Sequence, residues 1–175
     1  PATSPFWAAF GVQLRDIGFD RNWLHGAREH APELPAPLQA TALHWSTLDD
    51  PAPAATAARF FMLRQSQDAA SILGDALLRE AAAMGLLLAG EDNGLWQFPF
   101  NFEIVNGLYI LSDLPGDEPD CVMAVGGTTQ LLASASYPQE DVGSALDLGC
   151  GCGVLALLIA AAANRVVATD INPRA

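Results

Sequence analysis

The sequence predicts an α+β N-terminal region, helical and winged-helix-like, followed by the start of an α/β unit of the Rossmann-like, doubly wound type. Apolar residues recur at helical spacing through the first half of the chain. An Asn-Gly pair at residues 106–107 sits between two β-prone runs. The final stretch, 145–175, reads as a strand, a glycine-rich turn, an apolar helix and a second strand. These three observations define the predicted architecture.

Composition narrows the class of protein. The 175 residues are 51% hydrophobic and 16% charged, which is typical of a globular chain with room for one domain, or one small domain plus part of another. The net charge is −12, with only 8 Lys and Arg residues to neutralise phosphates. An acidic surface repels a polyanion, so we expect no binding of nucleic acid by residues 1–112 alone.

Two further features bear on location. No apolar run reaches the ~18–20 residues of a membrane span, and the first residues do not form a signal peptide. The three cysteines, Cys121, Cys150 and Cys152, form no disulfide framework, which is typical of a reduced, cytoplasmic protein. Cys150 and Cys152 alternate within a tight turn, so we interpret them as small loop residues and not as metal ligands.

Four helices are predicted in the first 63 residues. Ser4 and Pro5 are start signals for the first helix, and Gly18 ends it. The helices are expected over residues 6–17, from about 20, over about 36–45, and over 54–63, where Phe60 and Phe61 are core candidates. His25 and His30 are five residues apart and are interpreted as surface or core histidines, not ligands, and His44 stands alone.

Residues 68–112 should contain two helices and two β-ribbons. A short helix covers 68–73, and Asp75 caps a longer one. Strands near 86–89 and 95–100 flank a loop, and a hairpin covers 102–111 with a type I′ turn at Asn106-Gly107. This order is winged-helix-like. The helix after Asp75 either reads nucleic acid or is a scaffold, and its single basic residue, Arg79, favours the scaffold.

A linker and lead-in are expected over 113–144. The linker contains four acids, Asp113, Asp117, Glu118 and Asp120, which could form a cation site, although a solvated linker is favoured. A short strand is predicted over 122–125. Thr128 should cap a helix that runs to about Ser134.

The stretch 145–175 carries the most specific pattern. Ala145–Leu148 is a buried parallel strand, Val154–Ala163 a buried helix, and Arg165–Thr169 a second strand. Gly149, Gly151 and Gly153 alternate in the turn, where glycine permits positive φ and close approach of a ligand. Asp170 follows the second strand, 21 residues after Gly149. A βαβ unit with an acid at this spacing is a nucleoside-binding half-fold, with the acid on the ribose.

The type of nucleoside follows from two details. A dinucleotide site requires a third glycine where this chain has Val154. Asp147, two residues before the first glycine, would repel a pyrophosphate but suits an ammonium group. A ligand that carries both a ribose and a cationic amine is S-adenosylmethionine.

The motif Asp147-Leu-Gly-x-Gly-x-Gly153, followed by Val-Val-Ala-Thr-Asp170-Ile-Asn-Pro, resembles the first two motifs of class I S-adenosylmethionine-dependent methyltransferases. The residues of these motifs are most similar to the "methyltransferase small" group, which includes release-factor glutamine methyltransferases and ribosomal RNA guanine methyltransferases. The lead-in Val125-Gly-Gly-Thr-Thr-Gln-Leu-Leu-Ala133 is similar to that of members with a helical N-terminal extension. The resemblance implies a methyltransferase that acts on a nitrogen of a protein glutamine or a nucleic-acid base.

The resemblance also implies roles for single residues. Asp147 would lie near the methionine ammonium, and the loop of Gly149, Cys150, Gly151 and Gly153 would approach the cofactor closely. Asp170 would bind the ribose hydroxyls and Ile171 would lie against adenine. Thr128 or Thr129 would contact the methionine carboxylate. The alternative is a non-catalytic module that binds a protein partner, with an incidental βαβ stub.

We further expect the Rossmann-like part to be incomplete. In the resembled family, the first strand lies between the second and the fourth, and the acceptor motif follows the fourth. The sequence printed above shows two such strands. We therefore expect the 175 residues to be part of a longer polypeptide, and as a fragment to have two bare strand edges, no transferase activity and poor cofactor binding.

Overall fold

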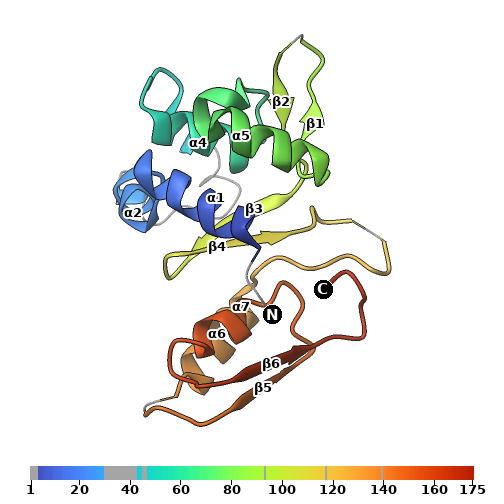
Figure 1. Cartoon of the computed structure of the whole chain (residues 1–175). Helices are drawn as coiled ribbons and strands as arrows, with labels where there is room; N and C mark the ends of the chain where they lie inside the picture. The colour runs from blue at the N-terminus through green and yellow to red at the C-terminus, as the bar shows by residue number, and fades with distance from the viewer. Residues whose placement is uncertain (1–3, 30–42, 45–46, 93, 117, 139) are drawn as a thin grey trace. The chain divides into compact units, whose positions relative to one another are not determined.

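The computed structural model describes residues 4–29, 43–44, 47–92, 94–116, 118–138 and 140–175 (Figure 1). They form two compact units, Pro1–Phe100 and Asn101–Ala175. The helix predicted over 36–45 and His30 lie almost entirely outside the described residues. Among the described residues, no helix is long and apolar enough to cross a membrane.

The first unit begins with the predicted helices. Helix α1 (Pro5–Asp16) starts after Ser4 with Pro5 in its first turn, and Gly18 follows its end at a φ of 78°. Helix α2 (Arg21–Glu29) is capped by Asp20, whose Oδ1 accepts the N–H groups of Asn22 and Trp23. Both predicted helices are therefore confirmed, with their start and stop signals at the expected residues.

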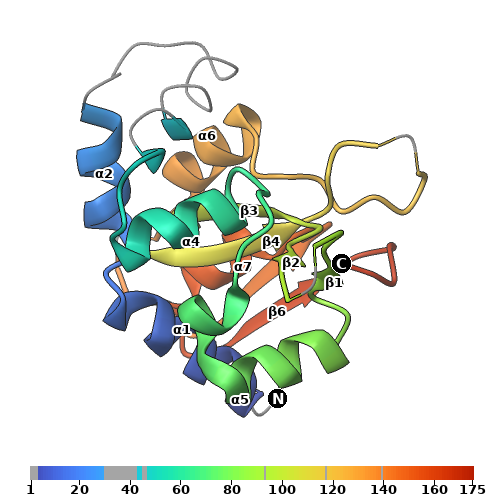
Figure 2. The ribbon, with the colours of Figure 1, turned by 90° about the horizontal axis from the view of Figure 1, so that it is seen from above.

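Aromatic residues form the core of this unit. Helix α4 (Pro53–Phe61) places Phe60 and Phe61 in the interior with no exposed surface, as predicted. The ring of Phe61 packs edge-on against Phe10 and Phe98, with ring centroids 5.8 Å and 4.9 Å away. Phe61 also stacks on Phe19 at 6.1 Å. Figure 2 shows α1, α4 and α5 gathered around one interior.

The break predicted between two helices at 73–75 falls at Gly74. Helix α5 (Ala69–Ala83) consists of two helical segments joined across a kink at Gly74, which has the non-helical angles φ 74° and ψ 159°. Asp68 caps the first segment, because its side chain accepts the N–H of Ala70. Strands β1 (Leu88–Ala89) and β2 (Trp96–Gln97) then pair antiparallel and are shorter than expected. The winged-helix identity of this unit stays a prediction.

The predicted hairpin is confirmed in the second unit. Strands β3 (Asn101–Val105) and β4 (Leu108–Ser112) pair antiparallel with Val105 opposite Leu108. Asn106 and Gly107 have φ values of 50° and 83°, which a type I′ turn requires.

The hairpin contacts later residues of its own unit. Ile110 packs with Val125 and Val154, and Glu103 accepts the N–H of Val125 over 3.0 Å. The boundary between the compact units along the chain follows Phe100, whereas the predicted boundary follows residue 112. The proposed division of the chain into domains stays a prediction.

The predicted βαβ unit forms at the C-terminal end. Strands β5 (Ala145–Leu148) and β6 (Val166–Thr169) pair parallel, with Leu148 opposite Thr169. Helix α7 (Val154–Ile159) connects them, and α6 (Gly127–Ser136) contacts α7. Both helices lie on one side of the two strands (Figure 1).

Four local predictions were wrong. The strand Ala145–Leu148 is not buried as predicted, since Leu146 and Leu148 are 58% and 75% exposed. Residues 122–125 form no strand, because the N–H of Val122 bonds to the side chain of Asp113 and that of Val125 to Glu103. Helix α6 begins after Gly126, so Thr128 lies within its first turn and makes no capping bond. Helix α7 ends at Ile159 and buries only Val154 and Ala156.

Candidate functional site

The glycine-rich turn after β5 adopts the backbone conformation that its sequence predicts. Gly149, Gly151 and Gly153 have φ values of 75°, 51° and 74°. Side chains rarely adopt this region, so glycine is favoured at each position. A Cβ atom added at any of the three would meet no atom within 4 Å. The turn therefore borders open space and is not held by packing.

Backbone bonds fix this turn against β6. The carbonyl of Thr169 accepts the N–H of Gly149 over 2.7 Å and that of Cys150 over 3.0 Å. The N–H of Gly153 bonds back to the carbonyl of Cys150 over 2.8 Å. The turn is thus a rigid loop at the carboxyl end of two parallel strands, which is where open α/β sheets bind ligands.

Asp170 connects the glycine turn to the residues that follow β6. One carboxylate oxygen accepts the N–H of Gly151 and the other that of Asn172, both over 2.8 Å. The bond from Asn172 and then that from Gly151 lower the pKa of Asp170. The carboxylate is therefore ionised at neutral pH, with lone pairs left for another donor.

Asp147 lies on the other side of the turn, at the third position of β5. Its side chain is buried, and one oxygen accepts the N–H of Ala156 in the first turn of α7 over 3.1 Å. This bond satisfies a helix donor that would otherwise have no partner within the helix. The capping role was not predicted from the sequence.

Cys150 lies between these two acids. Burial raises the pKa of the Cys150 thiol, and the charges of Asp147 and Asp170 raise it further. The thiol is therefore neutral at pH 7 and a weak nucleophile. This agrees with the interpretation of Cys150 as a loop residue. In the described parts of the chain, no cluster of three or more His, Cys, Asp or Glu side chains could hold a metal ion.

Ile171 and Thr128 are the outer candidates. Ile171 follows Asp170 and is fully exposed, at 101% of its reference area. Thr128 is exposed in the first turn of α6. The hydrogen bonds given above do not join Thr128 to the glycine turn, so the place of Thr128 in a site stays a prediction.

Sequence reasoning missed a second group of residues around the same turn. Arg174 forms ion pairs with Asp113 and Asp120, and Asn172 bonds to the carbonyl of Asp120. The signal in the sequence was the acidic linker, which was interpreted without a partner. Asn172 also accepts the N–H of Arg174 over 2.9 Å.

Comparison with known proteins supports one family. Residues 122–175 match the methyltransferase small domain. No curated protein matches the chain. The matched segment contains the lead-in helix α6, the glycine turn and Asp170. Residues 122–175 are therefore similar to a methyltransferase small domain, of which they carry the N-terminal motifs.

Proposed function

We propose that this protein is an S-adenosylmethionine-dependent methyltransferase that acts on a nitrogen atom of a protein glutamine or a nucleic-acid base. The observation that carries the proposal is the glycine turn itself. Three left-handed glycines border open space, and a carboxylate side chain stands on each side of them, Asp147 before the turn and Asp170 bonded to Gly151. The family match of residues 122–175 supports methyl transfer as the activity.

The residues present fit the charge of this cofactor. Two acids beside the turn, with no Lys or Arg within residues 145–164, disfavour a ligand that carries phosphates. A ligand that carries a sulfonium, an ammonium group and a ribose suits the same acids. Ile171 offers an exposed apolar surface next to Asp170, and an adenine ring would remove that surface from water.

Each residue has a proposed part in binding. Asp170 accepts bonds from the ribose hydroxyls with the lone pairs that Gly151 and Asn172 leave free. Asp147 lies near the methionine ammonium, and Thr128 or Thr129 contacts the methionine carboxylate. The turn of Gly149, Cys150, Gly151 and Gly153 follows the cofactor closely, because no Cβ intervenes at the glycines.

When bound, the cofactor supplies a methyl group on a positively charged sulfur. The part of this chain is then to hold the donor in one orientation and to exclude water from it. Rigid bonding of the turn to Thr169 and Asp170 serves that part, since an already ordered loop loses little entropy on binding. The proposed acceptor is a protein or an RNA.

Titration calorimetry of the full-length polypeptide with S-adenosylmethionine tests the proposal. We expect saturable binding that Asp170→Ala weakens roughly tenfold to a hundredfold, the value of bonds to a charged group. Binding of the wild type, with no change in Asp170→Ala, would remove Asp170 from the site. Absence of binding by the wild type would refute the proposed function. Labelled methyl transfer to glutamine peptides or to RNA then distinguishes the acceptors.

A further inference from the structure

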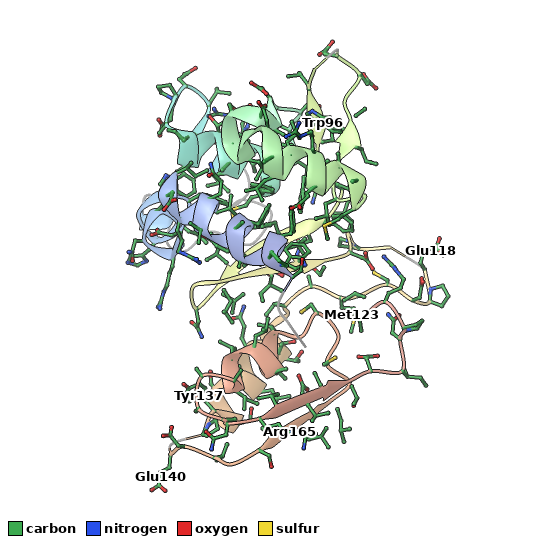
Figure 3. All side chains as sticks on the ribbon, in the orientation of Figure 1. Trp96, Glu118, Met123, Tyr137, Glu140 and Arg165 are labelled. Carbon is green, nitrogen blue, oxygen red and sulfur yellow. The ribbon has the colours of Figure 1, made fainter. Side chains whose placement is uncertain are left out.

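A closed loop lies next to the candidate site in the second unit. The N–H of Asp113 bonds to the carbonyl of Val122 over 2.9 Å, and the N–H of Val122 bonds back to Asp113 Oδ2 over 2.8 Å. These two bonds join the ends of a loop between Asp113 and Val122. Glu118, which lies in this loop, is labelled in Figure 3. The second oxygen of Asp113 is left facing another partner.

That partner is Arg174. Its Nη2 donates to Asp113 Oδ1 over 2.8 Å, and its Nη1 donates to the carbonyl of Asp120 over 3.3 Å. Asn172 reaches the same carbonyl, with 2.8 Å between its Nδ2 and the Asp120 oxygen. The side chains of Asn172 and Arg174, in the turn after β6, therefore bond to the loop at Asp113 and at Asp120.

Asp170 links these hydrogen bonds to the glycine turn. Asn172 uses its side chain on Asp120 and its own N–H on Asp170 Oδ1. The other oxygen of Asp170 accepts the N–H of Gly151. A continuous chain of bonds thus runs from Asp113, through Arg174 and Asn172, to Asp170 and the turn.

We propose that Asp113 and Arg174 are positioning residues, which hold Asp170 in the orientation that binds the cofactor ribose. The inference rests on the proposed function, and it gives the acidic linker a structural task. A carboxylate at the end of a two-stranded sheet can rotate, and each rotation moves its free lone pairs away from a ligand. The pair of Arg174 with Asp113 restricts the turn after β6, which carries Asn172, one of the donors to Asp170.

The strength of the effect follows from exposure. The side chains of Arg174 and Asp113 are 45% and 17% exposed, so solvent screens the pair and its contribution is modest. The N–H of Val122 and the guanidinium of Arg174 both lower the pKa of Asp113, so the pair is fully charged at neutral pH. We expect loss of the ion pair to weaken the affinity for S-adenosylmethionine by about twofold to fivefold, as for other exposed pairs.

Two variants remove the pair in different ways. Arg174→Ala deletes the cation. Asp113→Asn removes the charge but leaves an amide oxygen that accepts the N–H of Val122, so the loop stays closed. Arg165→Ala is the matched control, because it removes the same charge from the other end of β6 (Figure 3).

Two measurements are made on each variant and on the double variant. Amide hydrogen exchange at Gly151 and Asn172, followed by NMR without cofactor, reports how firmly Asp170 is held. Calorimetry reports the affinity for S-adenosylmethionine. We expect Arg174→Ala and Asp113→Asn to raise both exchange rates and weaken affinity about twofold to fivefold, with the double variant no worse than either.

Three outcomes would overturn the inference. In the first, exchange at Gly151 and Asn172 is unchanged in both variants. In the second, the wild type binds the cofactor and the variants bind equally well, which leaves the proposed function standing. In the third, Arg165→Ala has the same effect as Arg174→Ala, which shows only a response to net charge. Failure of the wild type to bind refutes the proposed function and, with it, the role of Asp170 in binding, whatever the exchange rates show.

Discussion

Replacing Gly153 by alanine separates the two reasons for a glycine in the turn. The residue has φ 74° and ψ 7°, in the left-handed region, and it precedes the first residue of α7. An added Cβ would meet nothing within 4 Å in the protein. The substitution therefore strains the backbone without a steric clash in the free protein.

The expected loss of stability is that of one left-handed alanine, about 1–2 kcal/mol. A loss of affinity is expected as well. The Cβ would project into the open space beside the turn, and if the cofactor occupies that space, displacing it by about 1 Å weakens productive binding by about tenfold or more. Stability and affinity therefore report two separate effects of the same methyl group.

Gly85 provides a matched control in the first unit. It also has a φ of 74°, and an added Cβ there also meets nothing within 4 Å. Gly85→Ala should cost similar stability and leave affinity for S-adenosylmethionine unchanged. Urea unfolding measures the first quantity and titration calorimetry the second.

One result would refute this reasoning. If Gly153→Ala and Gly85→Ala lose equal stability and neither loses affinity, the cofactor does not approach Gly153. The glycine would then serve the conformation of the turn alone.

Four other changes have defined outcomes. Asp147→Ala should destabilise the protein by about 1–2 kcal/mol, because the N–H of Ala156 loses its acceptor; unchanged urea unfolding would contradict the capping role. Phe61→Ala should cost about 3–5 kcal/mol, since the fully buried ring leaves a cavity, and a loss under 1 kcal/mol would show that the core collapses around it. Because the folded pKa of Asp113 lies below its ordinary 3.8, its contribution is present above that value and fades as the pH falls through the folded pKa. Unfolding below pH 4 should therefore depend on pH more steeply in the wild type than in Asp113→Asn. Residues 1–112 should not bind duplex DNA or RNA at physiological salt, and salt-sensitive micromolar binding in a polarisation assay would revive the recognition-helix interpretation.

Local signals in the sequence determined much of the fold. The turn at Asn106-Gly107 and the break at Gly74 each rest on a backbone angle that few residues adopt, so the residue type predicts the conformation. The same reasoning predicted the glycine turn and the parallel strands around it, because the βαβ unit has a fixed order and short spacing.

Only the tertiary structure decided how the acids are used. Asp147 caps α7 across 9 positions, and Asp113 pairs with Arg174 across 61. Side chains that far apart meet only when intervening elements bring them together, and no local pattern records the meeting. The absence of a strand over 122–125 has the same origin, since Glu103 and Asp113 take N–H groups that a strand partner would otherwise bond. Spacing along the chain thus determined the turn and its flanking acids, whereas contacts between distant segments determined what holds them in place.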